Sequence, residues 1–257
     1  MRAVPVMRVV ERELNVYKRL WRGLAFTMFV QPGLFLAAMG LGLGSLIDAH
    51  SGSVNGLTYL EFVAPGLLIA ECVQLAATES MWPVLAGVKW IRFYDGVVAT
   101  PIEPADLFGG FIVWTAIRTT FVAVAFLIVA TLFGGIPSAW AVLAVPAAAL
   151  CAVAFAAPIG AFSIGQETDL SFPIIMRLGI LPLFLFSGTF FPISELPGWL
   201  QPLAALSPLW HGVELARAAT TGQFDFWPDL GHVLFLVACL VAGTVWGVRA
   251  FAKRLRA

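Results

Sequence analysis

The stretch GLAFTMFVQPGLFLAAMGLGLGSLI, residues 23–47, contains no charged side chain. A helix rises about 1.5 Å per residue, so this stretch reaches about 38 Å and crosses a hydrocarbon core of about 30 Å with some tilt. The whole chain is similarly apolar, with 60% hydrophobic and 12% charged residues and a mean hydropathy of +0.91. Soluble domains carry about 25% charged residues. The composition excludes an ordinary water-soluble fold.

The expected fold is an all-α membrane protein with six transmembrane helices in a single domain over residues 23–257. The six spans are expected at residues 23–47, 60–82, 107–132, 139–164, 172–191 and 230–250. Residues 1–22 place apolar side chains every three or four positions, with charged side chains between them. This pattern predicts an amphipathic helix that lies on the cytoplasmic membrane surface, not a cleavable signal.

The basic residues indicate an orientation. If the N-terminus is cytoplasmic, the inner segments 1–22, 83–106, 165–171 and 249–257 hold 12 of the 15 Lys and Arg residues. The outer segments hold only Arg217. Because cytoplasmic loops carry an excess of Lys and Arg, we expect both termini on the cytoplasmic side.

The outer segment GTFFPISELPGWLQPLAALSPLWHGVELAR, residues 188–217, contains four prolines, which exclude one long helix. Its Trp and Leu residues are nevertheless too apolar for a water-exposed loop. Short re-entrant helices between the fifth and sixth spans satisfy both demands, since irregular backbone at membrane depth must pack on protein or line a cavity. The alternative is a lid without any role in transport.

Four charged residues fall within or near the spans: Glu71, Glu79, Arg118 and Arg177. Each costs roughly 2.5–3.5 kcal/mol at mid-span, so these side chains should face the bundle interior or one another. Helical spacing lets both carboxylates share one face, and a Glu71–Arg118 pair is geometrically plausible. A structural ion pair is slightly favoured over a polar substrate or proton path, and Arg177 has the alternative of extending to the membrane surface.

The chain lacks the motifs of several enzymes. A P-loop requires Gly-Lys-Ser/Thr, and none of the three lysines follows a glycine. The histidines are scattered without metal-ligand spacing, and the three cysteines lie singly in separate apolar segments. We therefore expect neither an enzyme nor a bound cofactor or metal in this chain.

The longest inner loop contains KWIRFYDGVVATPIEPADL, residues 89–107. Asp95-Gly96 predicts a turn, while Pro104 followed by Asp106 is typical of a helix start. An ordered element is therefore expected before the third span, where a soluble partner could press. The shorter loop GQETDLS, residues 165–171, offers a second contact.

Three stretches together carry a resemblance: YLEFVAPGLL (59–68), FYDGVVATPIEPADL (93–107) and FLFSGTFFPISELPGWLQPLAALSPLWHGVELARA (184–218). They resemble the permease subunits of type-2 ATP-binding-cassette (ABC) exporters, especially the branch of nodulation lipo-oligosaccharide and daunorubicin-type drug exporters. The resemblance implies a permease dimer, identical or mixed, in the bacterial inner membrane with two P-loop ATPase subunits. ATP and Mg²⁺ would bind those partners. Membrane lipid is a further expected partner, nucleic acid is not, and the expected cargo is amphiphilic or apolar.

The resemblance also implies roles for two sets of residues. Those that would transmit force from the ATPase are Tyr94, Asp95, Thr100, Pro101, Glu103, Pro104, Asp106, Glu167 and Asp169. Those that would form an extracellular gate are Phe191, Pro192, Glu195, Trp199, Pro208, His211, Glu214 and Arg217.

Three other functions are weighed against this one. A stand-alone secondary carrier could use Glu71 and Glu79 to couple transport to protons. An intramembrane enzyme is disfavoured because no nucleophile and base are paired. A non-transporting membrane scaffold is compatible with the ordered inner loop.

Overall fold

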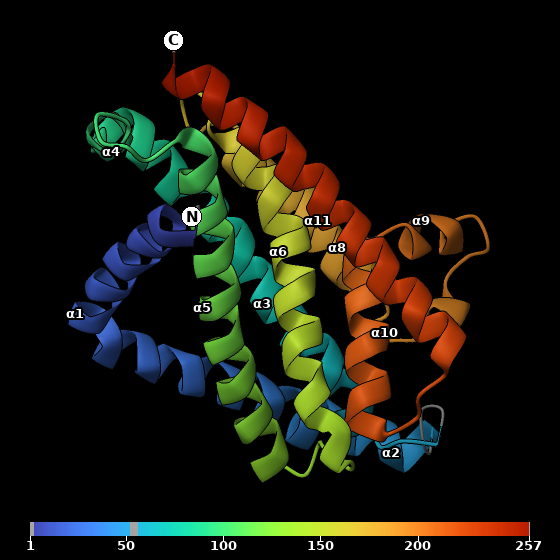
Figure 1. The fold of residues 1–257 in the computed structure, drawn as a ribbon. Coiled ribbons are helices and arrows are strands. Elements are labelled where there is room, and N and C mark those ends of the chain that lie inside the picture. The colour runs from blue at the N-terminus through green and yellow to red at the C-terminus, as the bar shows by residue number, and fades with distance from the viewer. Residues whose placement is uncertain (1–2, 52–55, 257) are drawn as a thin grey trace.

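The structure is a computed structural model that describes residues 3–51 and 56–256, and its regular elements are helices (Figure 1). Among the described residues, five helical stretches are long and apolar enough to cross a membrane: Met28–Ala49, Tyr59–Trp90, Pro104–Leu132, Ala139–Ser163 and Phe226–Leu255. The prediction of an all-α membrane protein is confirmed at this level.

Several of these stretches combine different helix types. The first comprises parts of α1 (Ala3–Leu36), the π-helix η1 (Ala37–Gly44) and α2 (Ser45–Ser51). The second joins α3 (Tyr59–Leu85) to the π-helix η2 (Ala86–Trp90). The third is α5 (Pro104–Leu132), the fourth joins the 3₁₀ helix η3 (Ala139–Leu143) to α6 (Ala144–Ser163), and the last is α11 (Phe226–Leu255).

The expected span at 172–191 is shorter than predicted. It consists of α7 (Phe172–Ile174), the π-helix η4 (Ile175–Ile180) and α8 (Leu181–Phe186). The helix ends before Gly188, whose φ of 77° is a left-handed conformation that terminates helices. At about 1.5 Å per residue, Phe172–Phe186 reaches only about 22 Å, less than a hydrocarbon core of about 30 Å.

Helix α1 has no break at the expected boundary between residues 22 and 23. Figure 1 shows that it bends into two arms while remaining helical. The first arm packs on α5, where Val9 is buried against Gly110. A Cβ atom at Gly110 would lie 2.5 Å from the Val9 Cβ, so a residue without a side chain permits this close approach.

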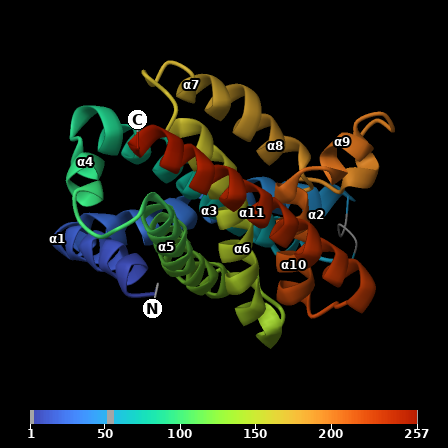
Figure 2. The ribbon, with the colours of Figure 1, turned by 45° about the horizontal axis from the view of Figure 1, so that its top comes forward.

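Helix α6 lies at the centre of the bundle and packs against α3, α5, α11 and α10 (Pro208–Thr221). Its buried face is rich in alanine, which lets neighbouring helices approach closely. Figure 2 shows α7 and α8 on one flank of the bundle and α5 on the opposite flank, with α3 and α11 between them.

The loops gather at two ends of the bundle. Helix α4 (Phe93–Val98) and the C-terminus lie at the upper end in Figure 1, and α2 lies at the lower end. At the lower end, the Ser138 amide donates to the Thr220 carbonyl over 3.1 Å, which joins the α5–η3 loop to the end of α10. We call the upper end the α4 end and the lower end the α2 end.

Candidate functional site

Three segments that are distant in sequence meet at the α4 end through Glu167. The Glu167 carboxylate pairs with Lys89 and, over 2.7 Å, with Arg254. Hydrogen bonds from Lys89 and then from Arg254 lower the pKa of Glu167 below its ordinary value. Asp169 in the same loop accepts a hydrogen bond from the Trp82 indole over 3.3 Å. The loop 165–171 is thereby tied to the end of α3, to η2 and to the end of α11.

Helix α4 occupies part of the predicted coupling loop. It starts after Arg92, whose backbone has a positive φ of 55° although it is not a glycine. The Arg92 guanidinium pairs with the Asp95 carboxylate over 2.8 Å. Tyr94 is buried, and its ring lies 5.9 Å from that of Phe251 in α11. The predicted turn at Asp95-Gly96 is wrong, because α4 continues through both residues. The chain turns instead at 99–101, where the exposed Thr100 hydroxyl donates to the Val97 carbonyl just before the exposed Pro101.

The predicted helix start at Pro104 is confirmed. Pro104 is the first residue of α5, and Glu103 precedes it in an extended conformation. The Asp106 carboxylate accepts a hydrogen bond from the Glu103 amide over 3.2 Å, which completes a capping box. These two acidic residues therefore stabilise the start of the helix, while the Asp95 side chain is about half exposed.

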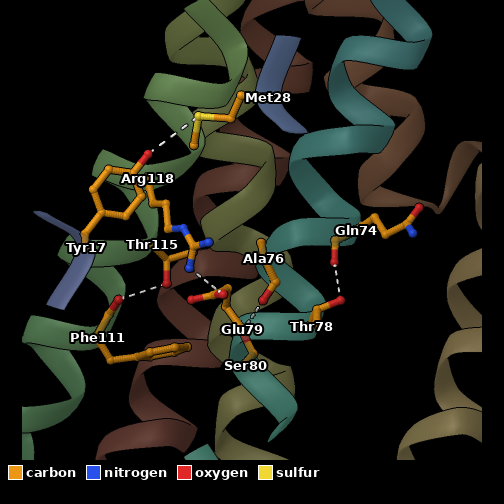
Figure 3. A network of polar contacts seen from close by, with 10 residues as sticks. All are labelled: Tyr17, Met28, Gln74, Ala76, Thr78, Glu79, Ser80, Phe111, Thr115 and Arg118. Carbon is orange, nitrogen blue, oxygen red and sulfur yellow. Dashed lines mark hydrogen bonds and ion pairs between the residues drawn. The ribbon is translucent and has the colours of Figure 1, made fainter. Parts of the chain in front are cut away.

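The intramembrane charges do not pair as expected. Arg118 in α5 forms its ion pair with Glu79, over 2.5 Å, and not with Glu71 (Figure 3). The Arg118 guanidinium also lies 5.7 Å from the centre of the Tyr17 ring in α1. Both charged side chains are largely buried, so the pair links α3, α5 and α1 in the interior.

Glu71 has a different neighbour. Its two carboxylate oxygens accept from the Gln31 side-chain amide, each over 2.9 Å. Gln31, Glu71 and Gln74 line a cavity of about 180 Å³ between α1, α3 and α8. Arg177 is exposed on η4 and lines an adjacent cavity of about 170 Å³ that also includes Gln74.

Near the α2 end, Arg217 connects α10 to its surroundings. Its guanidinium pairs with Glu214 over 2.7 Å, donates to the Gly188 carbonyl over 2.6 Å and lies 4.2 Å from the centre of the Phe62 ring. Arg217 thus holds α10 against α3 and against the segment that follows α8. The first residue of α10 is Pro208, as a helix start favours.

His211 in α10 faces His232 in α11, with their Nδ1 atoms 2.7 Å apart. The His211 ring stacks on Phe235 at 3.9 Å between centroids.

The other four predicted gate residues lie outside α10: Phe191, Pro192, Glu195 and Trp199. They follow α8 in and around η5 (Ile193–Glu195) and before α9 (Gln201–Ala205). Phe191 and Pro192 are half-buried, whereas Glu195 and Trp199 are exposed. The eight predicted gate residues therefore form two groups, four in α10 and four in the segment between α8 and α9.

Sequence reasoning missed four residues that complete these contacts: Gln31, Lys89, His232 and Arg254. In the sequence, Lys89 and Arg254 indicated only the orientation of the chain. They were predicted on the same side of the membrane as the acidic Glu167, and this was a signal that these residues pair. Gln31 was the one strongly polar side chain of the stretch 23–47. His232 gave no sequence signal for its pairing with His211.

The comparisons with known proteins agree with this architecture. The sequence matches the family described as ABC-2 type transporter over residues 6–220. Nodulation protein J of Rhizobium leguminosarum bv. viciae is 27% identical over 193 residues, which cover 75% of this chain and 73% of that protein. Nodulation protein J of Sinorhizobium fredii is 29% identical over 192 residues, with 74% and 71% covered.

A third relative is the inner membrane transport permease YadH of Escherichia coli, 21% identical over 225 residues, which cover 86% of this chain and 85% of that protein. The family match extends over most of the chain and includes α4, α10 and the helices between them. The chain therefore belongs to the ABC-2 type transporter family, as the membrane permease subunit of an ABC exporter, without an ATPase site of its own.

Proposed function

We propose that two permease subunits, identical or related, assemble with two P-loop ATPase subunits in the bacterial inner membrane and export an amphiphilic or apolar cargo. Both termini and α4 would face the cytoplasm, as the distribution of Lys and Arg favours. The E. coli relative YadH is an inner membrane transport permease, which supports the location. ATP and Mg²⁺ would bind to the partner subunits.

The observation that carries this proposal is the set of contacts at the α4 end. Tyr94 anchors α4 on Phe251 of α11, and Glu167 joins Lys89 to Arg254. Pressure on α4 from a nucleotide-dependent partner would therefore move α11 and η2 together, because packed helices and ion pairs transmit displacement. In this mechanism α4 is the coupling helix, and the loop 165–171 is a second contact.

The segment between α8 and α11 would form the outer gate. We propose that residues 172–191, which comprise α7, η4, α8 and the non-helical segment after α8, form the fifth of six spans and that α9 and α10 are re-entrant helices beyond it. Irregular backbone at 187–191 packs against α3, where a Cβ atom at Gly66 would lie 2.8 Å from the Thr189 Cα. Such packing is what non-helical backbone needs at membrane depth. Arg217 would hold the gate closed until the paired bundles change conformation.

Charge reversal at Asp95 tests the coupling role. Asp95→Arg should leave the permease folded but reduce cargo exported per ATP hydrolysed by about tenfold or more, since an exposed acidic side chain is replaced at the proposed contact. Asp95 is a sharper test than Glu103 or Asp106, because those residues also cap α5. The measurement is export and ATP hydrolysis by the reconstituted complex.

Glu11→Arg provides the control, because Glu11 is an exposed acid that pairs with an arginine three residues before it, as Asp95 does, but lies outside the proposed contact. Unchanged coupling in Asp95→Arg would contradict the assignment of α4. Uphill transport by the permease without an ATPase would overturn the proposed function as a whole.

A further inference from the structure

Helix α3 carries polar side chains on a second side, away from the Glu79–Arg118 pair. Glu71 and Gln74 lie near the middle of this helix, and Figure 3 shows the Gln74 side chain extending away from Arg118. Gln74 lines both the cavity that contains Glu71 and the adjacent cavity that contains Arg177. Polar groups thus face a groove whose walls are otherwise mainly apolar, including Phe126 and Phe184.

The charge of Glu71 is not balanced within the described part of the chain. Among the Lys, Arg and His side chains that the structure describes, no nitrogen lies within 4.0 Å of its carboxylate. Its hydrogen-bond donor is the neutral Gln31 amide, while Arg118 is engaged by Glu79. A carboxylate in the middle of a membrane span normally pairs with a cation or a protein dipole, because the bilayer does not solvate it.

We propose that Glu71 is a specificity-determining residue for cargo and that it selects amphiphiles with a protonated amine in the head group. The ammonium would lie against the Glu71 carboxylate, with the Gln31 and Gln74 amide oxygens as further acceptors. The faces of Phe126 and Phe184 attract cations as well as apolar groups. The apolar part of the cargo would lie along the walls. This inference rests on the proposed function and assigns a cargo class to it.

Equilibrium binding to the full-length permease tests the proposal. The protein is placed in phosphatidylcholine nanodiscs and titrated with a dansyl-labelled dodecyl amphiphile that bears a primary ammonium. The same titration uses the N-acetylated probe, which is neutral but nearly the same shape. We expect the ammonium probe to bind about tenfold more tightly than the acetylated probe, as charge complementarity in a low-dielectric site requires.

Variants locate this selectivity. Glu71→Gln should reduce the affinity ratio of the two probes to about one, while the affinity for the acetylated probe stays the same and shows that the site is intact. Glu71→Asp should restore part of the ratio. Glu11→Gln removes an exposed carboxylate on the first arm of α1, far from the proposed site in sequence, and should leave the ratio unchanged.

Equal affinity of the wild-type protein for both probes would overturn the proposal, as would a selectivity that survives in Glu71→Gln. The titration uses no nucleotide and no ATPase subunit. Its failure is therefore separate from failure of the proposed function, which the coupling experiment with Asp95→Arg measures.

Discussion

Glu79 and Glu71 are carboxylates of the same helix, yet their surroundings differ. Glu79 faces α5 and is neutralised by Arg118, close to the Tyr17 ring. Glu71 faces α1 and α8, and among the described side chains its hydrogen-bond donor is the neutral amide of Gln31. Both carboxylates line cavities of about 180 Å³, so they differ in their partners: an arginine pairs with Glu79, whereas a neutral amide contacts Glu71. The comparison teaches that an intramembrane charge acquires its role from the helix it faces.

Helical geometry explains the difference. Eight residues at about 100° per residue rotate Glu79 by about 80° relative to Glu71, so the two side chains point to different neighbours. Helical spacing would let both carboxylates share one face, but in the structure Glu79 meets α5 and Glu71 meets α1. The Glu71–Arg118 pair that was expected as plausible therefore does not form. Arg118 lies about midway along α5, so its position along the helix did not predict which carboxylate it contacts. The rotation of α3 about its axis directs Glu79 toward Arg118.

The largest expected effect comes from removing Arg118. Arg118→Leu leaves the Glu79 carboxylate uncompensated in the interior and should lower the free energy of unfolding by roughly 3 kcal/mol. The double replacement with Glu79→Leu should recover most of this loss, because no unpaired charge remains. Unfolding in mixed detergent micelles measures both. Equal destabilisation by the single and double replacements would contradict the structural role of the pair.

Replacement of Glu71 should affect stability much less. Glu71→Gln retains a hydrogen-bonding group opposite Gln31 and should change the free energy of unfolding by less than about 1 kcal/mol. The same micelle assay compares it directly with Glu79→Gln, which should cost more because Arg118 loses its partner. If the two replacements cost the same, the contrast between the two sides of α3 fails.

Tyr17 tests how far the structural pair extends. Tyr17→Leu removes the ring beside Arg118 and should lower the free energy of unfolding by about 0.5–1 kcal/mol. Tyr17→Phe is the control, since it keeps the ring and loses only the hydroxyl that contacts Met28. Both are measured by unfolding of the purified permease. If Tyr17→Phe lowers the free energy of unfolding as much as Tyr17→Leu does, the effect comes from the hydroxyl and not from the ring beside Arg118.

The smallest effect is expected at Glu167, which is paired but exposed. Its folded-state pKa is lowered, so its contribution is present above the ordinary carboxylate pKa of 4.5 and is lost as the pH falls through the lower folded-state value. Thermal unfolding followed from pH 7 to pH 3 should show this acid-dependent part reduced in Glu167→Gln. An identical acid profile in the two proteins would show that these surface pairs contribute nothing measurable.

Much of the framework could be predicted from local chemistry. The helices over 23–47 and from Pro104 were predicted from residues that are neighbours in the sequence. The structure has a helix at both places. The end of α8 before Gly188 was missed, because apolar residues on both sides made the span appear longer. An ordered element was expected in this loop, but the turn at Asp95-Gly96 was wrong, because Gly96 favours a turn in isolation whereas the burial of Tyr94 two residues earlier stabilises the helix.

The sequence by itself determined that this protein is a helical membrane permease of the exporter type and which segments share an end of the bundle. These properties follow from apolar length, charge distribution and short motifs, all of which act along the chain. Only the tertiary structure decided that Arg118 pairs with Glu79, that Gln31 meets Glu71 and that His211 meets His232. Such pairs depend on the rotation and tilt of whole helices, which are fixed by packing among many residues rather than by any local pattern.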